Sequence, residues 1–194
     1  MDIPRCERSS SEQTFFFQVA FPEGTSWAGR TLACFACTCE VDAETLIPPM
    51  LSNHKQGCDI PEGFLTSYER NFAFVVFPTA EGRIVSDYAE KLRFAALEFG
   101  ETADFATVGG HASWLLEDES PATYAGSTEM DFLLQLPPGL TFETVPGAAP
   151  QMELDLMGEA AESPLPYYQL FLGNAIYLFG TRSGDPLVYA ITQI

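Results

Sequence analysis

Five cysteines and two histidines are the side chains of this sequence that could bind a metal ion. Cys34, Cys37 and Cys39 follow one another closely, and His54 and Cys58 lie downstream. Zn²⁺ prefers thiolate and imidazole ligands at such short spacings. A zinc knuckle needs its cysteine pair on a tight turn, whereas this segment reads as a strand, in which Cys34 and Cys37 point to opposite faces. We therefore expect buried, inert thiols and no metal. A zinc- or thiol-dependent enzyme or metal-binding protein that uses these five residues remains the alternative.

Other catalytic patterns are missing from the sequence. There is no nucleophile elbow, no Gly-rich phosphate loop with its lysine and no calcium-loop pattern. His111, beside Gly109 and Gly110, is typical of a loop or strand-end histidine rather than a general base. We expect no catalytic residue and no cofactor, so that the chain is a binding protein and not an enzyme. A housekeeping scaffold domain is the second alternative.

Charge is the strongest signal in the composition. The chain has 27 acidic and 9 basic residues, for a net charge of −18, and no Lys or Arg occurs between Arg93 and Arg182. Such a surface repels nucleic acid and anionic lipid and attracts basic proteins. We expect acids of this stretch to bind a basic partner protein, with exposed tyrosines as anchors. The candidate partner-binding residues are Glu117, Asp118, Glu119, Glu129, Asp131, Glu153, Asp155, Glu159, Glu162, Tyr124 and Tyr167, with Tyr168 as a further possible anchor.

The length of 194 residues and the 46% hydrophobic content predict one domain with a substantial core. Within it, residues 1–84 could form an N-terminal sub-region and residues 85–194 a second region. No apolar stretch is long enough for a membrane helix. Residues 1–13 lack the apolar core of a signal peptide. We therefore expect no membrane association and a cytoplasmic location. The odd number of cysteines also argues against a disulfide framework, so we expect all five thiols to be reduced.

Strand patterns dominate the sequence, and one segment has helical periodicity. Asp87 and Glu90 form a capping-box-like start, and Tyr88, Leu92 and Phe99 belong to one apolar stripe, so a helix is predicted over about 87–99. Residues 151–161 read as a short helix or an acidic loop. The predicted strands are 14–21, 30–41, 72–77, 106–108, 113–116, 130–136, 165–172, 175–179 and 187–194. The expected fold is α+β, with a largely antiparallel sheet and one clear helix.

Three blocks in the second half resemble the YwqG-like family, a bacterial family whose role is not established. The blocks are Val-Gly-Gly-His-Ala-Ser-Trp at 108–114, Met-Asp-Phe-Leu-Leu-Gln-Leu at 130–136 and Gly-Asn-Ala-Ile-Tyr-Leu-Phe at 173–179. The likeness covers about residues 85–180. Ala112 stands where the family prefers Pro, and Asn174 where an acidic residue is more usual.

The residues of these blocks are typical of structural rather than catalytic roles. Gly109 and Gly110 permit a turn with positive φ. Gln135 could satisfy a buried backbone group. The residues expected to form one core face are Trp114, Phe132, Leu134, Tyr177 and Phe179.

The resemblance also implies a functional setting. Bacterial proteins of such families resemble immunity proteins that sit beside secreted antibacterial toxins, most commonly in type VI secretion. This implication agrees with the charge, because an acidic inhibitor can pair with the basic cleft of a nuclease. The expected function is therefore an immunity protein that captures and occludes a cognate basic toxin.

Overall fold

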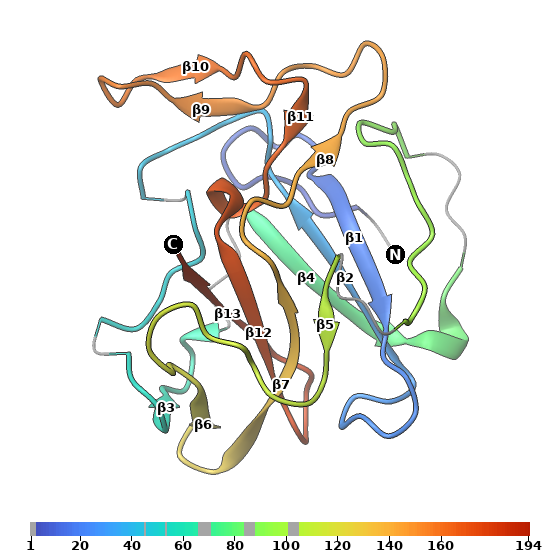
Figure 1. The fold of residues 1–194 in the computed structure, drawn as a ribbon, viewed down its shortest axis with the longest axis vertical. Coiled ribbons are helices and arrows are strands. Elements are labelled where there is room, and N and C mark those ends of the chain that lie inside the picture. The colour runs from blue at the N-terminus through green and yellow to red at the C-terminus, as the bar shows by residue number, and fades with distance from the viewer. Residues whose placement is uncertain (1–2, 45, 53, 66–70, 84–87, 101–104) are drawn as a thin grey trace.

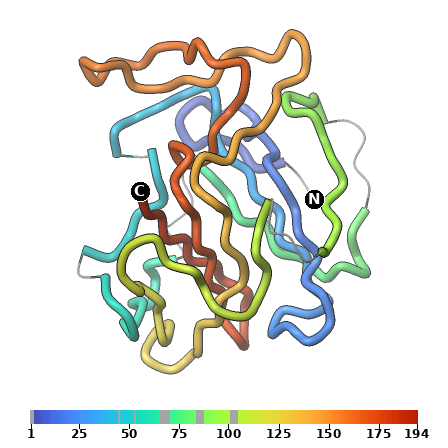
Figure 2. Tube along the Cα trace, in the orientation of Figure 1, coloured from blue at the N-terminus to red at the C-terminus, as the bar shows by residue number. Residues whose placement is uncertain are grey.

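Two sheets, antiparallel except for one parallel strand pair at the edge of the larger sheet, form the body of the molecule in the computed structural model, which describes residues 3–44, 46–52, 54–65, 71–83, 88–100 and 105–194. Figures 1 and 2 show the smaller sheet lying beside the long strands of the larger one. The smaller sheet has the order β1-β2-β4, from β1 (Thr14–Ala20), β2 (Arg30–Ala36) and β4 (Phe72–Pro78).

The larger sheet has the order β13-β12-β7-β6-β3, and β5 also pairs with β7. Its strands are β3 (Cys58–Ile60), β5 (Thr107–Val108), β6 (Pro121–Tyr124), β7 (Thr128–Leu136), β12 (Ala175–Thr181) and β13 (Val188–Gln193). Two further strand pairs are β8 (Phe142–Glu143) with β11 (Tyr167–Tyr168), and β9 (Met152–Leu154) with β10 (Ala160–Glu162). The short 3-10 turns are η2 (Thr79–Glu81) and η3 (Phe171–Gly173).

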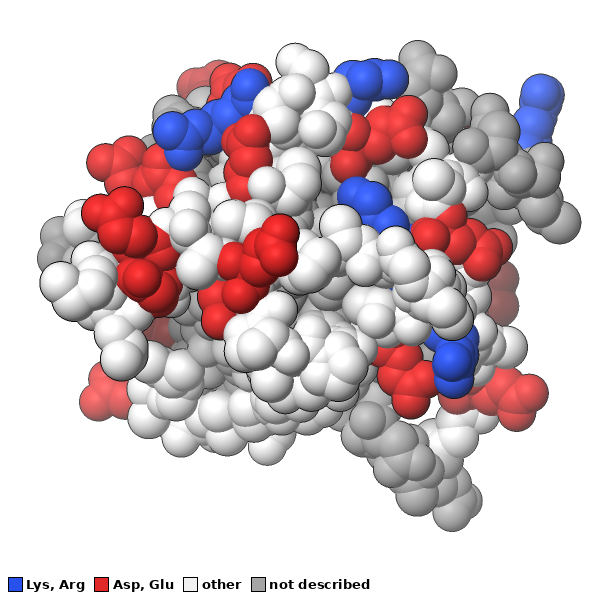
Figure 3. Space-filling view, turned by 90° about the horizontal axis from the view of Figure 1, so that it is seen from above, with Lys and Arg blue, Asp and Glu red and all other residues white. Residues whose placement is uncertain are grey.

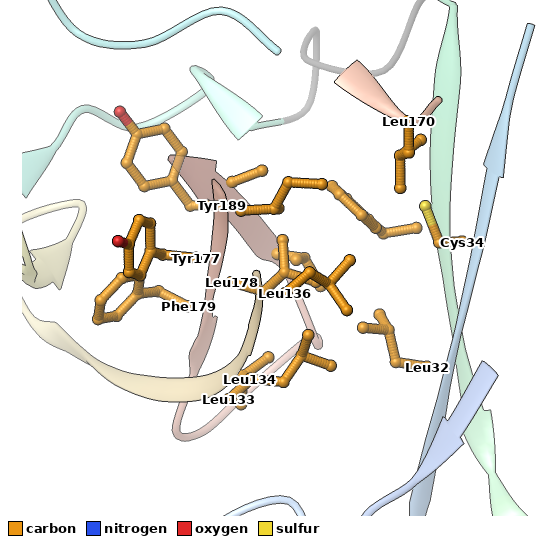
Figure 4. Close-up of a cluster of buried hydrophobic side chains, with 14 of the residues drawn as sticks. Leu32, Cys34, Leu133, Leu134, Leu136, Leu170, Tyr177, Leu178, Phe179 and Tyr189 are labelled. Carbon is orange, nitrogen blue, oxygen red and sulfur yellow. The ribbon is translucent and has the colours of Figure 1, made fainter. Parts of the chain in front are cut away.

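Strand alternation explains how the two sheets pack. Leu32 and Cys34 of β2 belong to the main core, whereas Phe35, between them and the strand end, belongs to a small cluster on the other face. Figure 4 shows Leu32 and Cys34 pointing from the smaller sheet toward Leu136 and Leu178 of the larger one. Successive side chains of a strand point to opposite faces, so the period of two in this sequence places one apolar set in the interface between the sheets.

The larger sheet is covered on its second face as well. The Trp114 ring stacks on Tyr177, with ring centroids 4.3 Å apart, and lies 6.0 Å from Phe179, while Phe132 contacts Phe179 at 5.6 Å. These four residues form the core face that the sequence predicted. Leu134 does not belong to it. Its cross-strand partner is Leu178, which must face away from the neighbouring Tyr177, so Leu134 lies on the inner face.

Most predicted strands are confirmed, but the predicted fold class is wrong. The segments at 14–21, 72–77, 106–108, 130–136, 175–179 and 187–194 form β1, β4, β5, β7, β12 and β13, whereas the segment 30–41 forms β2 only over residues 30–36. In contrast, residues 113–116 form no strand, and only Tyr167–Tyr168 of the segment 165–172 does. The described residues contain no α-helix, so the fold is β-rich and not α+β.

The helix predicted at 87–99 does not form over residues 88–99, and Asp87 lies outside the described residues. The segment runs extended beside β8, where Arg93 N donates to Glu143 O and Val145 N donates to Lys91 O. Of its apolar stripe, only Leu92 is buried. Backbone pairing and one buried leucine therefore outweigh the local helical preference, because helix propensity is a weak force beside tertiary contacts.

One large core cluster draws on both halves of the chain. It includes Phe16, Leu32 and Phe74 from before residue 85, and Leu136 and Tyr177 from after it. Residues 1–84 and residues 85–194 therefore contribute to the same hydrophobic core. In the described part of the chain, no helix has the length and apolar character needed to span a membrane.

Candidate partner-binding surface

The β9–β10 hairpin projects from one end of the molecule (Figure 1). Its turn is closed by Asp155, whose Oδ1 accepts hydrogen bonds from Met157 N at 2.8 Å and from Glu159 N at 2.9 Å. Asp155 N also donates to Glu159 O at 2.8 Å. Gly158 supplies the positive φ of 80° that the turn requires. The sequence predicted either a short helix or an acidic loop for residues 151–161, and the structure shows a β-hairpin instead.

The hairpin tip exposes two large apolar side chains. Leu156 is 105% exposed and Met157 is 84% exposed, the first and third most exposed of the large hydrophobic side chains among the described residues. Asp155 closes the backbone of the turn with these hydrogen bonds, so less backbone entropy is lost when the tip binds a partner, although the two exposed side chains must still lose rotamer freedom.

Carboxylates line both strands of the hairpin. Glu153 lies on β9, Glu162 on β10, and Asp155 and Glu159 flank the tip. In the part of the chain that the structure describes, none of these four residues forms an ion pair. Figure 3 looks onto this end of the molecule and shows more acidic than basic side chains across it. The four hairpin carboxylates therefore give this end of the molecule a negative surface potential.

The base of the hairpin is bonded to the segments that follow β2 and β11. Met152 N donates to Thr38 O at 2.9 Å, just after β2. The Gln151 side chain donates to Gln169 O and accepts from Gln169 N, both at 2.8 Å. Between this base and the loop after β2 lies a small groove of about 80 Å³. Its polar lining includes Glu40 and Glu153, so the groove extends the acidic surface inward.

Two other predicted acids share one arginine. Arg182 Nε donates to Asp131 Oδ2 at 2.9 Å, and Arg182 Nη1 pairs with Glu129. These carboxylates come from β7, at the end of the larger sheet remote from the hairpin (Figure 1). Arg182, the residue that ends the base-free stretch, thus cancels one of the two negative charges of Glu129 and Asp131.

Two of the acids at 117–119 accept hydrogen bonds from other parts of the protein. Asp118 accepts from Gln56 Nε2 at 2.7 Å and from Ser120 N at 2.9 Å, and Glu119 accepts from Gln193 Nε2 at 2.9 Å. Glu117 is exposed. Their loop lies beside β6, away from the hairpin (Figure 1). The structure therefore gathers four of the predicted acids in one place and leaves the other five elsewhere.

The predicted tyrosine anchors are largely internal. Tyr168 is 2% exposed and donates to Ala149 O. Tyr124 is half-buried, and its hydroxyl accepts from Gly63 N at 3.1 Å. Tyr167 is half-buried on β11. The exposed apolar residues that the sequence analysis missed are Leu156 and Met157. The sequence pattern that could have indicated them is Leu156-Met157-Gly158, a turn-forming segment between Asp155 and Glu159.

The five residues of the zinc alternative are dispersed. Cys34 is buried in the core, Cys58 lies on β3, and the His54 ring packs edge-on against Tyr189 at 5.4 Å. Only Cys37 and Cys39 lie together, with their Sγ atoms 3.4 Å apart. Among the described residues, no group of three or more His, Cys, Asp or Glu side chains is arranged to hold a metal ion.

The blocks that carry the resemblance have structural roles. Gly109 and Gly110 have φ of 69° and 72°. Gln135 accepts from Ser113 N at 2.8 Å and donates to Ser113 O at 2.9 Å, which fixes the loop that carries Trp114. Gln135 thus binds backbone groups, as expected, but those of the exposed Ser113 and not buried ones. No protein-family model, curated protein or solved structure matches this chain.

Proposed function

We propose that this chain is an immunity protein that binds and neutralises a secreted antibacterial toxin, with the β9–β10 hairpin as the main contact. The observation that carries the proposal is the combination of an exposed apolar tip, Leu156 and Met157, with four carboxylates that no described cation neutralises. The toxin setting comes from the family resemblance of residues 85–180. The proposed partner is a nuclease of a type VI secretion system.

The chemistry of a nuclease matches this surface. An enzyme that binds nucleic acid needs a basic cleft, because phosphate contacts dominate its affinity for the substrate. The carboxylates of the hairpin would compete for the same cations and speed the encounter by about 10- to 1000-fold at low salt. Full burial of Leu156 or Met157 in an apolar pocket of the toxin would contribute about 1.5–3 kcal/mol each. The hairpin would then occlude the cleft.

The decisive experiment is co-purification of the chain with the product of the adjacent gene, followed by a rescue assay in cells that express that product. We expect a stable complex whose association rate falls with salt, together with survival of the cells. A complex that does not form even at low salt, with no rescue, would remove the proposal. Binding without rescue would instead favour the scaffold alternative, because a scaffold need not block an active site.

A further inference from the structure

A cluster of thiols lies where the loop after β2 meets the N-terminal segment. Cys37 and Cys39 contact each other at an Sγ–Sγ distance of 3.4 Å, because the chain bends at Thr38 and Cys39. Cys6 lies near Cys37, close enough for its thiol to contribute to the raised pKa of Cys37. The sequence does not reveal this cluster, since Cys6 is far from the other two cysteines in the chain.

The three sulfurs differ in environment. Cys39 is exposed, and Ser9 Oγ lies 3.7 Å from its Sγ, so a hydroxyl can stabilise charge on that sulfur. Cys37 is half-buried, and burial followed by the hydrogen bonds with Cys6 and Cys39 raises the pKa of its thiol. Cys6 is only 2% exposed, with its sulfur 3.9 Å from Asn71 Oδ1 and 4.0 Å from Glu40 Oε2. A reagent in solution therefore reaches Cys39 first.

We propose that Cys37 and Cys39 are a modification site, a dithiol that hydrogen peroxide converts to an intramolecular disulfide, which a thiol reductant reverses. The Cys39 sulfur attacks the peroxide, so that an S–O bond forms, the O–O bond breaks and water leaves. The Cys37 sulfur then attacks the sulfenic acid on Cys39, which forms the S–S bond and breaks the S–O bond. The proton of the Cys37 thiol leaves with the hydroxyl group as a second water, and the peroxide takes up the two electrons.

The geometry favours this pair over any other. The two sulfurs are already in contact at 3.4 Å, and a disulfide requires them to approach to about 2.05 Å. The contact also protects Cys39 from further oxidation, because a neighbouring thiol captures the sulfenic acid before a second peroxide does. The proposal does not depend on the proposed function.

The test uses the full chain, reduced and then treated with an equimolar amount of hydrogen peroxide, followed by alkylation and peptide mass spectrometry. We expect two of the five thiols to be lost together, with the peptide that contains Cys37 and Cys39 lighter by two hydrogen atoms. A thiol reductant restores both. The Cys39→Ser variant should keep all its remaining thiols under the same treatment, whereas the control Cys58→Ser should still form the disulfide.

Three results would overturn the assignment. One is oxidation of Cys39 to a sulfinic acid while Cys37 stays open to alkylation. Another is a disulfide that contains Cys6. The third is a disulfide between two chains through Cys39, which gel filtration under non-reducing conditions would reveal.

Discussion

The indole ring of Trp27 fills the space that any side chain at Gly180 would need. A Cβ at position 180 would lie 2.2 Å from Cζ2 of Trp27 and 2.7 Å from Cδ1 of Leu133. Trp27 is fully buried and donates from Nε1 to Thr181 O at 3.1 Å. This contact joins the loop between β1 and β2 to β12 of the larger sheet.

Gly180→Ala should destabilise the protein by about 1–3 kcal/mol, because an added methyl group in a filled core forces its neighbours to move. The measurement is urea unfolding followed by tryptophan fluorescence. Gly100→Ala is the matched control, since a Cβ at Gly100 meets no atom within 4 Å. Equal stability of the two variants would contradict the packing described for Trp27.

Gln135→Ala should lower the free energy of unfolding by about 1 kcal/mol, because it removes two hydrogen bonds to Ser113. The effect is small because Ser113 is exposed and water can replace part of these bonds. The loop that carries Trp114 should loosen, which the near-ultraviolet circular dichroism of the ring stacked on Tyr177 would report. Gln18→Ala, at an exposed position of β1, is the control and should change neither stability nor spectrum. An unchanged spectrum in Gln135→Ala would show that the remaining contacts, the ring stacking and the hydrogen bonds of the Tyr177 hydroxyl with Ser113 and Leu115, hold the loop without Gln135.

Protonation of His54 should weaken the fold as the pH falls. Burial lowers the pKa of His54, against the opposing effect of the Glu119 carboxylate, and neither ring nitrogen has a hydrogen-bond partner within the described structure. The unfolded chain therefore takes up a proton near pH 6.5, whereas the folded chain resists it. The stability that the neutral ring provides is complete above pH 6.5 and declines below it, down to the lowered folded-state pKa.

His54→Phe keeps a ring against Tyr189 and removes this titration. We expect the slope of the unfolding free energy with pH, at most about 1.4 kcal/mol per pH unit for one proton, to flatten between pH 6.5 and the folded-state value. Gln18→Ala, at an exposed position without a titratable side chain, should leave the slope unchanged. If both variants follow the parent curve, the pH dependence arises from the carboxylates instead.

Arg182→Gln should destabilise the protein by about 1 kcal/mol or less, because the pair is partly exposed and screened by solvent. The side chains of Arg182 and Glu129 are 55% and 59% exposed, whereas that of Asp131 is 15% exposed. Without the arginine, the two carboxylates repel each other. The loss of stability should therefore shrink in high salt, and the exposed Arg83→Gln should show no such salt dependence.

The hairpin acids can be separated from the total charge. The triple variant Glu153→Gln, Glu159→Gln, Glu162→Gln leaves the turn-closing Asp155 intact. We expect it to slow association with the proposed toxin by about tenfold at low salt. The control, Glu23→Gln with Glu62→Gln and Glu81→Gln, removes the same charge from exposed positions elsewhere. If both triple variants bind equally slowly, net charge and not the hairpin governs the encounter.

Much of the strand content could be predicted from the sequence, because the runs that form β1, β4, β7 and β12 show both apolar alternation and turn residues at their ends. The hairpin at 152–162 could not be predicted in this way. Its strands are short, and their stability comes from the Asp155 turn and from the bond between Met152 N and Thr38 O. The false helix has the same cause, since a distant β8 decided the conformation around Leu92.

The site was only partly predictable for a related reason. Acidity could be counted in the sequence, but which acids remain unneutralised depends on where Arg182 reaches. Likewise, the contact between Cys37 and Cys39 follows from a bend that no spacing rule describes. Sequence patterns report which face a strand buries, whereas the partners of single polar side chains are set by the tertiary fold.

The shared core has a consequence for how this protein is made. Leu32, Cys34 and Phe74 are synthesised early, yet the residues that cover them, such as Leu136 and Leu178, leave the ribosome much later. The first sheet must therefore wait with an uncovered apolar face while more than half of the chain is translated. Nascent chains arrested before residue 130 should be held by chaperones, and folding should be completed only when translation is nearly over.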